Sequence, residues 1–469
     1  MKLPLILQTI SKDLHGKNAK AIIVGGSVRD HFLALPIKDY DIEVYGLETM
    51  EALEEILARY GSVNLVGKSF GVLKFSHKGE EYDFSFPRSE TKIAEGHRGF
   101  DVEVDGSLDF KTAAKRRDFT VNALGYDVEE KQFLDPYGGL EDSKKKQLRH
   151  IDDKTFIEDP LRVYRAVQFC ARFGFTLARE TKILCKKMVS DGMLEELPKE
   201  RVYLEWKKLL LKAPKPSSGF ELMRELGIVE RYFPELHALI GVAQSLQWHP
   251  EGDVWVHTMM TVDEMVALLG EHEKYNLKMM FAILCHDLGK AVSTTVDEEG
   301  MIRSIGHEKT GLALTKTLMY RLMDEHDLIE SLLPLIEHHL KPSQFYAAKS
   351  GSKAIRKLAT KVNIEELVTV AKADFLGRTT QEALTHDYKA GTWLLKKAEG
   401  LKVKNNPLER LVQGRDLIDL GLEPSPQFKA IIDEVYALQL EGTITVRDDA
   451  LSWLTKKYIK RGKETKYDE

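Results

Sequence analysis

Short apolar runs and alternating apolar positions mark the first 150 or so residues as a mixture of strands and helices. The run at 21–24 predicts a buried strand, and residues 27–35 predict the helix that follows it. A second strand is predicted over 41–45, and the segments 72–75 and 82–86 predict a hairpin across 78–80. Strands and helices therefore alternate in this part of the chain.

Helical periodicity replaces the strand signals beyond residue 150, for example over 161–169. Breaker segments at 214–219 and 247–252 interrupt it, and 414–453 predicts amphipathic helices to which we assign no chemistry. We therefore expect an α+β head, with a small mixed sheet and helices, followed by an otherwise all-α chain. The expected domains are a head at 1–150, a helical neck and body at 151–250, a third domain at 251–380 and a helical C-terminal region at 381–469.

The composition limits the class of protein but does not indicate a reaction. The 469 residues, 43% hydrophobic and 30% charged, describe an ordinary soluble protein of several domains. The net charge of −5 means that nucleic-acid affinity must come from local basic patches, such as 144–149 or the tail 456–466. The three cysteines form no metal or disulfide pattern, and neither a signal peptide nor a membrane span is visible. We expect a cytoplasmic protein, and no protein partner can be deduced.

A double glycine and a spaced pair of aspartates accompany the first two predicted strands. Gly25 and Gly26 let the backbone approach a phosphate, and the helix start that follows offers N–H groups to it. Asp39 and Asp41 stand two residues apart, and the strand period of two places both carboxylates on one face, where they can hold a divalent metal on a nucleoside triphosphate. Each element alone is explained by a turn or a solvated strand end. Together they favour a nucleotidyltransferase head.

A second cluster in the head supports the same chemistry. Arg116 and its neighbour offer guanidinium groups that grip phosphate, while Asp118 and Asn122 can reach a ribose hydroxyl. Further on, Asp159 precedes a proline in the manner of an N-cap with proline at the first helical position, which is a sufficient structural explanation. Asp159 and Arg162 are also three apart, which would place them on one helix face, able to hydrogen-bond a base edge.

These segments resemble the class II tRNA nucleotidyltransferases, which include CCA-adding enzymes, and the bacterial poly(A) polymerases, within the polymerase-beta-like superfamily. The resemblance covers about the first 210 residues and follows the family's motif series in order: 25–30 with 39–41, 116–123, 135–139, 158–162, and 200–201 with 205. It implies a polymerase-beta-like head in which Asp39 and Asp41 carry catalytic Mg²⁺. It further implies nucleotide-binding roles for Gly25, Gly26, Arg29, Arg116, Asp118, Asn122, Asp159, Arg162 and Arg165, with Asp159 and Arg162 selecting the base.

Separate chemistry lies beyond residue 250. His257, the doublet His286–Asp287 and Asp374 form a mixture of imidazole and carboxylate ligands that suits a divalent transition metal, nickel, manganese, iron or zinc, rather than magnesium. The doublet lies near the end of an apolar helix predicted over 279–288, which we expect Gly289 to terminate. A lone histidine there would more often be a hydrogen-bonded core residue.

These four residues in this order resemble the HD phosphohydrolase superfamily, most closely at 284–290 and 373–378. The resemblance implies that His257, His286, Asp287 and Asp374 share one metal. A second metal would need His307 with either His338 or His339. A domain of this type can also be retained for structure alone, so hydrolysis is a separate question.

Several functions compete at this point. The leading hypothesis is addition of C and A residues to the tRNA 3′ end from CTP and ATP, with tRNA as partner and a metal-dependent phosphohydrolase activity as an addition. An enzyme adding only A, to tRNA or to RNA generally, has the same motifs. An alarmone synthetase-hydrolase also joins both domain types, but the domain order argues against it. A non-catalytic RNA-binding module is hard to reconcile with carboxylates at both 39 and 41.

Overall fold

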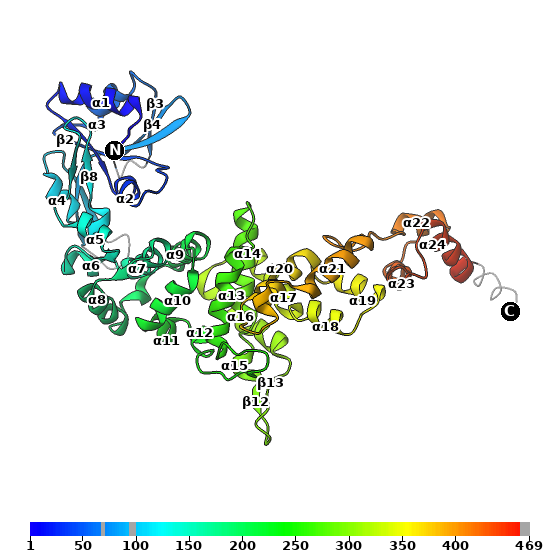
Figure 1. The fold of residues 1–469 in the computed structure, drawn as a ribbon. Helices are drawn as coiled ribbons and strands as arrows, with labels where there is room; N and C mark the ends of the chain where they lie inside the picture. Colours follow the sequence, from blue (N-terminus) through cyan, green and yellow to red (C-terminus); the bar gives the residue numbers. More distant parts are fainter. Residues whose placement is uncertain (67–70, 93–99, 460–469) are drawn as a thin grey trace. The chain divides into compact units, whose positions relative to one another are not determined.

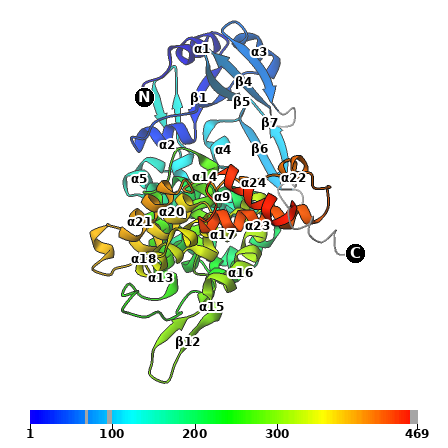
Figure 2. The ribbon, with the colours of Figure 1, turned by 90° about the vertical axis from the view of Figure 1, so that its right-hand side faces the viewer.

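The computed structural model describes residues 1–66, 71–92 and 100–459. The chain forms two compact units, Met1–Pro234 and Glu235–Glu469, and each has its own core (Figures 1 and 2). The finer boundaries expected at residues 150, 250 and 380 stay a prediction.

A seven-stranded mixed sheet organises the start of the first unit, in the order β3-β4-β5-β2-β1-β8-β9. Only β2 and β5 pair in parallel among these strands, and all other neighbours are antiparallel. The strands are β1 (Lys20–Val24), β2 (Asp41–Tyr45), β3 (Ser62–Val66), β4 (Val72–His77), β5 (Glu80–Ser85), β8 (Gly125–Asp127) and β9 (Gln132–Leu134). This confirms the expected α+β head with a small mixed sheet.

The two faces of the sheet bury different side chains. One face packs alternate residues such as Ile23, Val44 and Phe75 against helices α1 (Leu5–His15) and α3 (Met50–Leu57). The other face holds Ile22, Val24 and Tyr45 against α4 (Phe110–Ala114). Because side chains alternate along a strand, Asp41 and Glu43 of β2 belong to the same face as Tyr45.

The hairpin predicted across residues 78–80 is confirmed. Strands β4 and β5 are joined by Lys78 and Gly79, whose φ angles are both positive, 52° and 86°. This is the geometry of a type I′ turn, which matches the twist of the paired strands. The turn sets the register of β4 against β5, and on the other side of β5 its Asp83 lies beside Asp41 of the parallel strand β2.

The rest of the first unit consists mainly of helices, together with a few short strands. Its remaining elements are α2 (Gly26–Phe32), β6 (Arg88–Lys92), β7 (Phe100–Val104), η1 (Thr120–Asn122), α5 (Gly139–Lys144), β10 (Gln147–Leu148), α6 (Asp153–Glu158), α7 (Leu161–Phe173), β11 (Thr176–Leu177), α8 (Arg179–Ser190), η2 (Met193–Glu196), α9 (Lys199–Lys212), α10 (Pro216–Glu225), α11 (Ile228–Tyr232) and α12 (Pro234–His237), which reaches into the second unit. The breaker at 214–219 falls between α9 and the first turns of α10, as predicted.

As far as residue 459, the second unit is helical apart from one small hairpin, β12 (Thr294–Val296) and β13 (Ile302–Ser304). Its helices are α13 (Val254–Val266), α14 (Glu273–Cys285), α15 (Lys290–Ser293), α16 (His307–Leu322), α17 (His326–His338), α18 (Lys341–Ala347), α19 (Ser352–Ala359), α20 (Ile364–Leu376), η3 (Ala383–Thr385), α21 (Lys389–Gly400), α22 (Gly414–Asp419), α23 (Gln427–Glu441), α24 (Arg447–Leu454) and η4 (Thr455–Ile459). Among the described residues, no helix has the length and apolar character needed to cross a bilayer.

Candidate functional sites

A cavity of about 530 Å³ opens in the first unit where the head sheet meets helix α7. Its described lining carries eight arginines against three aspartates, so it is strongly cationic in a chain whose net charge is negative. The arginines are Arg29, Arg88, Arg116, Arg117, Arg162, Arg165, Arg172 and Arg201. Guanidinium groups converging on one cavity suit a polyanion such as a triphosphate.

A chain of hydrogen bonds links four side chains that line the cavity. Arg29 of α2 donates from Nη1 to Asn122 Oδ1 (2.8 Å), and Asn122 Nδ2 donates to Asp118 Oδ1 (2.9 Å). Arg165 of α7 then donates from Nε to Asp118 Oδ2 (2.7 Å). Burial alone would raise the pKa of Asp118, but Arg165 and Asn122 outweigh it and lower the pKa. Four of the predicted nucleotide-binding residues are thus locked into one network.

The double glycine begins helix α2, which carries Arg29 of this network. Gly25 has a φ of 68°, which only glycine adopts without strain, and it caps helix α2. A side chain there would also come within 3.0 Å of Arg117 Nη1. Both Gly25 and Gly26 line the cavity, so the backbone forms part of its wall.

The two aspartates are placed differently from each other. Asp41 is the first residue of β2 and lines the cavity, whereas Asp39 precedes the strand. The strand begins only at Asp41, so the strand period of two does not extend to Asp39 as predicted, although the charge of Asp39 acts on Asp41. The pKa of Asp41 is raised, first by desolvation of the carboxyl and then by the charges of Asp83, Asp39 and Glu43, against the opposing effect of Arg117.

Sequence reasoning missed two acidic residues of this site. Asp83 lies beside Asp41 across the parallel pair β2 and β5. Glu43 is buried and receives Arg116 Nη2 (3.1 Å), Arg117 Nη2 (2.9 Å) and the Tyr45 hydroxyl (2.7 Å). For Glu43 the sequence did hold a signal, because a charged residue stands between apolar residues of a strand. Burying a charge costs free energy unless the charge is paired.

Asp159 and Arg162 both line the cavity, but not as two residues on one helix face. Helix α7 begins at Leu161 with Pro160 as its N-cap, so the predicted N-cap at Asp159 is wrong by one residue. Asp159 is in extended conformation and accepts from Leu161 N (3.3 Å) and Arg201 Nη2 (3.2 Å). Arg162 donates to the carbonyl oxygens of Thr155 (2.7 Å) and Arg116 (2.6 Å). The short connection between α6 and α7 holds Asp159, and Arg162 follows in the first turn of α7.

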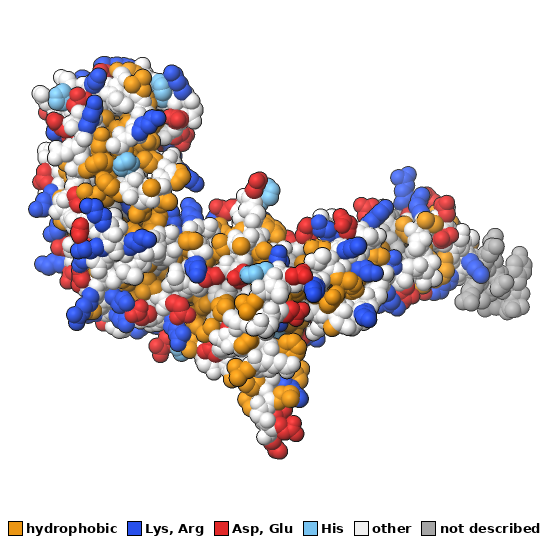
Figure 3. Space-filling view, viewed as in Figure 1, with side chains coloured by type: hydrophobic (Ala, Val, Ile, Leu, Met, Phe, Trp, Pro, Cys, Tyr) orange, Lys and Arg blue, Asp and Glu red, His pale blue; other side chains and the backbone are white. Residues whose placement is uncertain are grey.

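The predicted basic patches are partly neutralised. Lys144, Lys145 and Lys146 are exposed, but Lys145 pairs with Glu141 (3.2 Å) and Arg149 pairs with Asp142 (3.2 Å). In the tail, Lys457 pairs with Glu434, and residues 460–466 lie outside the described residues. Lys and Arg side chains are nonetheless frequent on the face shown in Figure 3.

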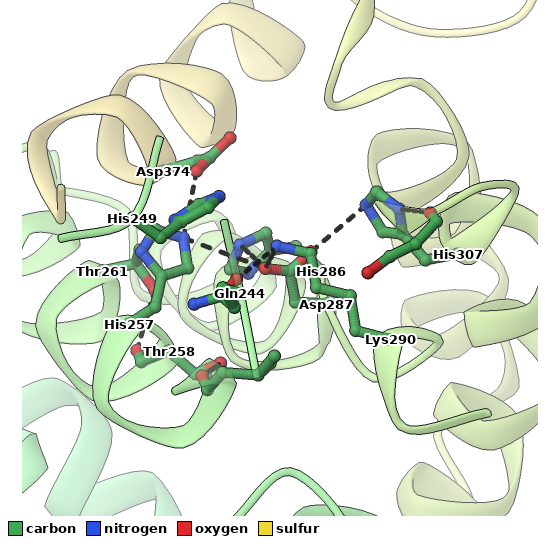
Figure 4. Close-up of polar contacts among 12 residues, drawn as sticks. Gln244, His249, His257, Thr258, Thr261, His286, Asp287, Lys290, His307 and Asp374 are labelled. Carbon is green, nitrogen blue, oxygen red and sulfur yellow. Dashed lines mark hydrogen bonds and ion pairs between the residues drawn. The ribbon is translucent and has the colours of Figure 1, made fainter. Parts of the chain in front are cut away.

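The second site collects histidines and aspartates around Asp287 (Figure 4). Helices α13, α16 and α20 carry His257, His307 and Asp374, whereas His286 and Asp287 follow the end of α14 and His339 follows the end of α17. Asp287 Oδ1 lies 3.2 Å from His307 Nε2 and 3.9 Å from His339 Nε2. Asp287 Oδ2 lies 3.3 Å from His286 Nε2 and 3.8 Å from His257 Nε2, while His257 Nε2 also meets Asp374 Oδ1 at 3.1 Å. The structure thus brings together all four residues predicted for this site.

His307 and His339 complete this cluster, which decides between the two histidines left open by the sequence. His338, by contrast, pairs only weakly with Glu337 (4.0 Å). The ligand atoms form two compact groups, His257 with His286 and Asp374, and Asp287 with His307 and His339. Each group is small enough for one metal ion.

Backbone oxygens set the tautomer of the histidines. The Nδ1 atoms of His286, His307 and His339 each lie 2.7 Å from a carbonyl oxygen, of Ile283, Ser304 and Ile336 respectively. Because a carbonyl can only accept, each Nδ1 must carry the proton, which leaves Nε2 with a lone pair facing Asp287. Metal-binding histidines are held in this way.

The charges of the cluster favour bound cations. Burial would raise the pKa values of Asp287 and Asp374, but His286 and Lys290 beside Asp287, and Arg378 beside Asp374, hold both pKa values well below the usual range. Burial lowers the pKa of His339 to about 3, so its ring is neutral. His286 Nε2 and both Asp287 oxygens are buried and make no hydrogen bond among the described residues. Imidazole nitrogens and ionised carboxylate oxygens gathered in one buried cluster fit a divalent transition metal.

The helix that precedes the doublet ends earlier than predicted. Helix α14 stops at Cys285 rather than Leu288, and Gly289 is right-handed (φ −66°), so it is not a left-handed helix terminator. Its role is close packing, because a Cβ there would lie 2.0 Å from the His307 carbonyl oxygen. Gly289 lets α16 approach closely enough to bring His307 to Asp287.

Fold and sites together define a class: a nucleotidyltransferase head joined to an HD-type metal domain. Three family models match the chain: the poly A polymerase head domain over residues 21–149, the probable RNA and SrmB-binding site of polymerase A over 174–240, and the HD domain over 254–378.

Curated relatives extend over most of the chain. The multifunctional CCA protein of Pasteurella multocida (strain Pm70) is 34% identical over 386 residues, which cover 80% of this chain and 88% of the relative. That of Methylobacillus flagellatus is 37% identical over 369 residues, 77% and 85% of the two chains. The chain belongs to the multifunctional CCA protein family.

Solved structures share the fold. The Bacillus stearothermophilus CCA-adding enzyme in complex with CTP is 22% identical with a TM-score of 0.67, covering 99% of this chain and 100% of that one. The Thermotoga maritima CCA-adding enzyme complexed with tRNA is 20% identical with a TM-score of 0.60, covering 97% and 96%.

Proposed function

We propose that this protein adds C and A residues to the tRNA 3′ end from CTP and ATP, without a nucleic-acid template. The observation that carries the proposal is the cavity in which eight arginines surround Asp41 and the glycine turn. Its relatives are named multifunctional CCA proteins, and solved structures of this fold include complexes with CTP, ATP and tRNA.

In this proposal Asp39 and Asp41 hold Mg²⁺, with Asp83 beside them. The raised pKa of Asp41 among three other carboxylates supports this, because a divalent cation would relieve their repulsion. When bound, Mg²⁺ would favour attack of the RNA 3′ hydroxyl on the α-phosphate and neutralise the leaving pyrophosphate. Gly25, Gly26, Arg29 and Arg116 bind the triphosphate.

The remaining residues of the cavity bind the sugar and select the base. Asp118 and Asn122 reach the ribose and Arg165 holds Asp118 in place. Asp159 and Arg162 select the base by hydrogen bonds to its edge. An enzyme that adds only A would use the same residues, and the names of the relatives favour the full CCA sequence over that alternative.

The test is incorporation of each labelled triphosphate into tRNA that lacks its 3′ CCA. We expect CTP to be used first, ATP to be used after two C residues, and UTP and GTP to be rejected. Incorporation of ATP alone into tRNA ending in CC would establish the A-adding alternative. A poly(A) polymerase would instead extend unrelated RNA with many A residues.

We also propose a metal-dependent phosphohydrolase at the second site. His257, His286, Asp287 and Asp374 hold nickel, manganese, iron or zinc, and His307 and His339 complete the second ligand group. The metal would supply a hydroxide nucleophile. Lys290, 2.7 Å from Asp287 Oδ2, and Arg378, 2.8 Å from Asp374 Oδ1, bring positive charge to the cavity. A 2′,3′-cyclic phosphate or a nucleotide monoester suits RNA-end repair in the cytoplasm.

A further inference from the structure

The breaker segment at residues 247–252 contributes to the second site, although sequence analysis gave it no role. Trp248 and His249 line the cavity of about 240 Å³ that Asp287, His307 and His339 also line. The His249 ring lies 4.5 Å, centroid to centroid, from the ring of His257. Trp248 is therefore one residue away in the chain from a side chain that packs on a metal-ligand candidate.

This segment is held rigidly. Glu251 Oε1 accepts from His249 Nδ1 (2.9 Å) and lies 2.8 Å from His257 Nδ1, while Glu251 Oε2 accepts from Thr379 N (3.1 Å). Gln244 closes the other side, since its Nε2 donates to the Gly252 carbonyl (3.3 Å) and its Oε1 accepts from Lys290 Nζ (2.7 Å). Trp248 is presented by a fixed segment, which reduces the entropy lost on binding.

Trp248 differs from the other tryptophans in its exposure to solvent. Its exposed fraction is 56%, whereas Trp206 and Trp255 are 1% and 0% exposed. It is the one strongly exposed tryptophan of the five in the sequence, all of which lie within the described residues. An indole that lines a cavity and yet stays exposed to water lacks the burial that normally stabilises it.

The size of the cavity indicates what lies against this indole. A volume of about 240 Å³ is below the roughly 300–1,000 Å³ of pockets that enclose a whole drug-sized ligand. A phosphate with part of a sugar would fill it, next to Lys290 and Arg378. Any base attached to that sugar would have to lie outside the cavity, and Trp248 is a lining residue whose side chain is exposed to solvent there.

We propose that Trp248 is a stacking platform for the nucleobase of the substrate, and so a specificity-determining residue of the second site. This inference rests on the proposed phosphohydrolase activity. Stacking uses the face of the base, which every base has, so the site would accept all four bases. It would prefer a nucleoside phosphate, or the last nucleotide of an RNA, over a phosphoester without a base.

The test compares two substrates in the metal-loaded full-length protein: a 2′,3′-cyclic nucleotide and the 2′,3′-cyclic phosphate of 1-O-methylribose, which has no base. We expect Trp248→Ala to lower the ratio of kcat/KM for the nucleotide to that for the base-free substrate about 10-fold, mainly through KM. Trp248→Phe should keep most of the ratio. Leu246→Ala removes an exposed apolar side chain two residues away, outside the cavity lining, and should keep the ratio entirely.

Fluorescence gives a readout independent of turnover. Adenosine 2′-monophosphate added without metal should quench the wild-type tryptophan emission more than that of Trp248→Phe, because stacking on Trp248 quenches its indole. Equal ratios in wild type and Trp248→Ala, with hydrolysis intact, would overturn the stacking platform alone. Failure of the wild type to hydrolyse either substrate with nickel, manganese, iron or zinc would overturn the phosphohydrolase and this inference with it.

Discussion

The two sites of this protein gather charge in opposite ways. In the head, Arg116 and Arg165 are partly exposed, with side-chain fractions of 20% and 32%, and buried carboxylates hold them in place. In the second unit, His257 is 0% and Asp287 2% exposed, and their ligand atoms face one another. An open cationic cavity suits a large anion that enters from solvent, whereas a buried set of lone pairs suits a small desolvated cation.

In both sites, the hydrogen-bond partners of a charged or polar side chain determine which of its atoms remain available to a ligand. Arg116 and Arg117 are arranged by buried Glu43, so the cation faces the cavity from a fixed position. His286, His307 and His339 are arranged by backbone carbonyls that take up one nitrogen and leave the other available. In both sites the supporting groups decide the chemistry that the exposed atoms offer.

The largest expected effect separates the two activities. Asp41→Ala should abolish incorporation of CTP and ATP while leaving hydrolysis of a 2′,3′-cyclic nucleotide, because only the head loses its metal-binding carboxylate. Asp287→Ala should do the reverse, since Asp287 lies at the centre of the second cluster. Both assays on both variants, with metal content determined, check this. Normal incorporation by Asp41→Ala, or hydrolysis surviving in Asp287→Ala, would contradict the assignment of the respective site.

Stability of the head should depend on the ionised form of Asp118. Removing that charge with Asp118→Asn leaves Arg165 without its buried partner, so we expect a loss of about 3 kcal/mol in unfolding free energy near pH 7. The folded pKa of Asp118 is lowered, so its stabilisation is present above the ordinary value of 3.8 and is lost as pH falls through the folded pKa. Denaturation of both proteins from pH 7 to pH 3 should show the gap narrowing at the acidic end. A gap that stays constant would show that the charge of Asp118 has no part in it.

Base selection should be a smaller effect. Arg162→Ala should reduce discrimination among CTP, ATP, UTP and GTP by about 1–3 kcal/mol, because a base edge would lose its hydrogen-bond partners. Arg172→Ala is the matched control on the same helix and should weaken all four triphosphates alike. Single-turnover incorporation with each triphosphate measures both. Unchanged preferences in Arg162→Ala would leave Arg162 the purely structural role of bonding to Thr155 and Arg116.

Removing a helix cap in each unit should have the smallest effect, and it tests whether the two units unfold independently. Asp253 caps α13, which carries His257, by accepting from Val256 N (2.9 Å) and Gly241 N (2.6 Å). Asp253→Ala should lower the stability of the second unit by about 1 kcal/mol. Asp152→Ala, which removes the cap of α6 in the first unit, is the matched control. Limited proteolysis of each variant should show the loss in its own unit, and a loss in both would mean that the units unfold together.

Sequence patterns were most successful where local structure is determined locally. The strand 41–45, the hairpin at 78–80 and the helix from 161 were predicted because alternation, turn residues and apolar spacing act over a few residues. Element ends were less accurate. Helix α7 begins one residue later than its proline suggests, and α14 ends three residues early, because capping and packing decide ends.

The sequence by itself determined the residue types of both sites and their order, since glycine turns, paired aspartates and the histidine-aspartate doublet are each visible in the chain. Only the tertiary structure showed that Asp83 lies beside Asp41, that Glu43 holds two arginines, and that His339 rather than His338 joins the cluster. These depend on strand register and on helix rotation, which contacts between distant residues fix. The proposed role of Trp248 also depends on the tertiary structure. It rests on the cavity that Trp248 lines and on its exposure to solvent, and the residues next to it in the sequence predict neither.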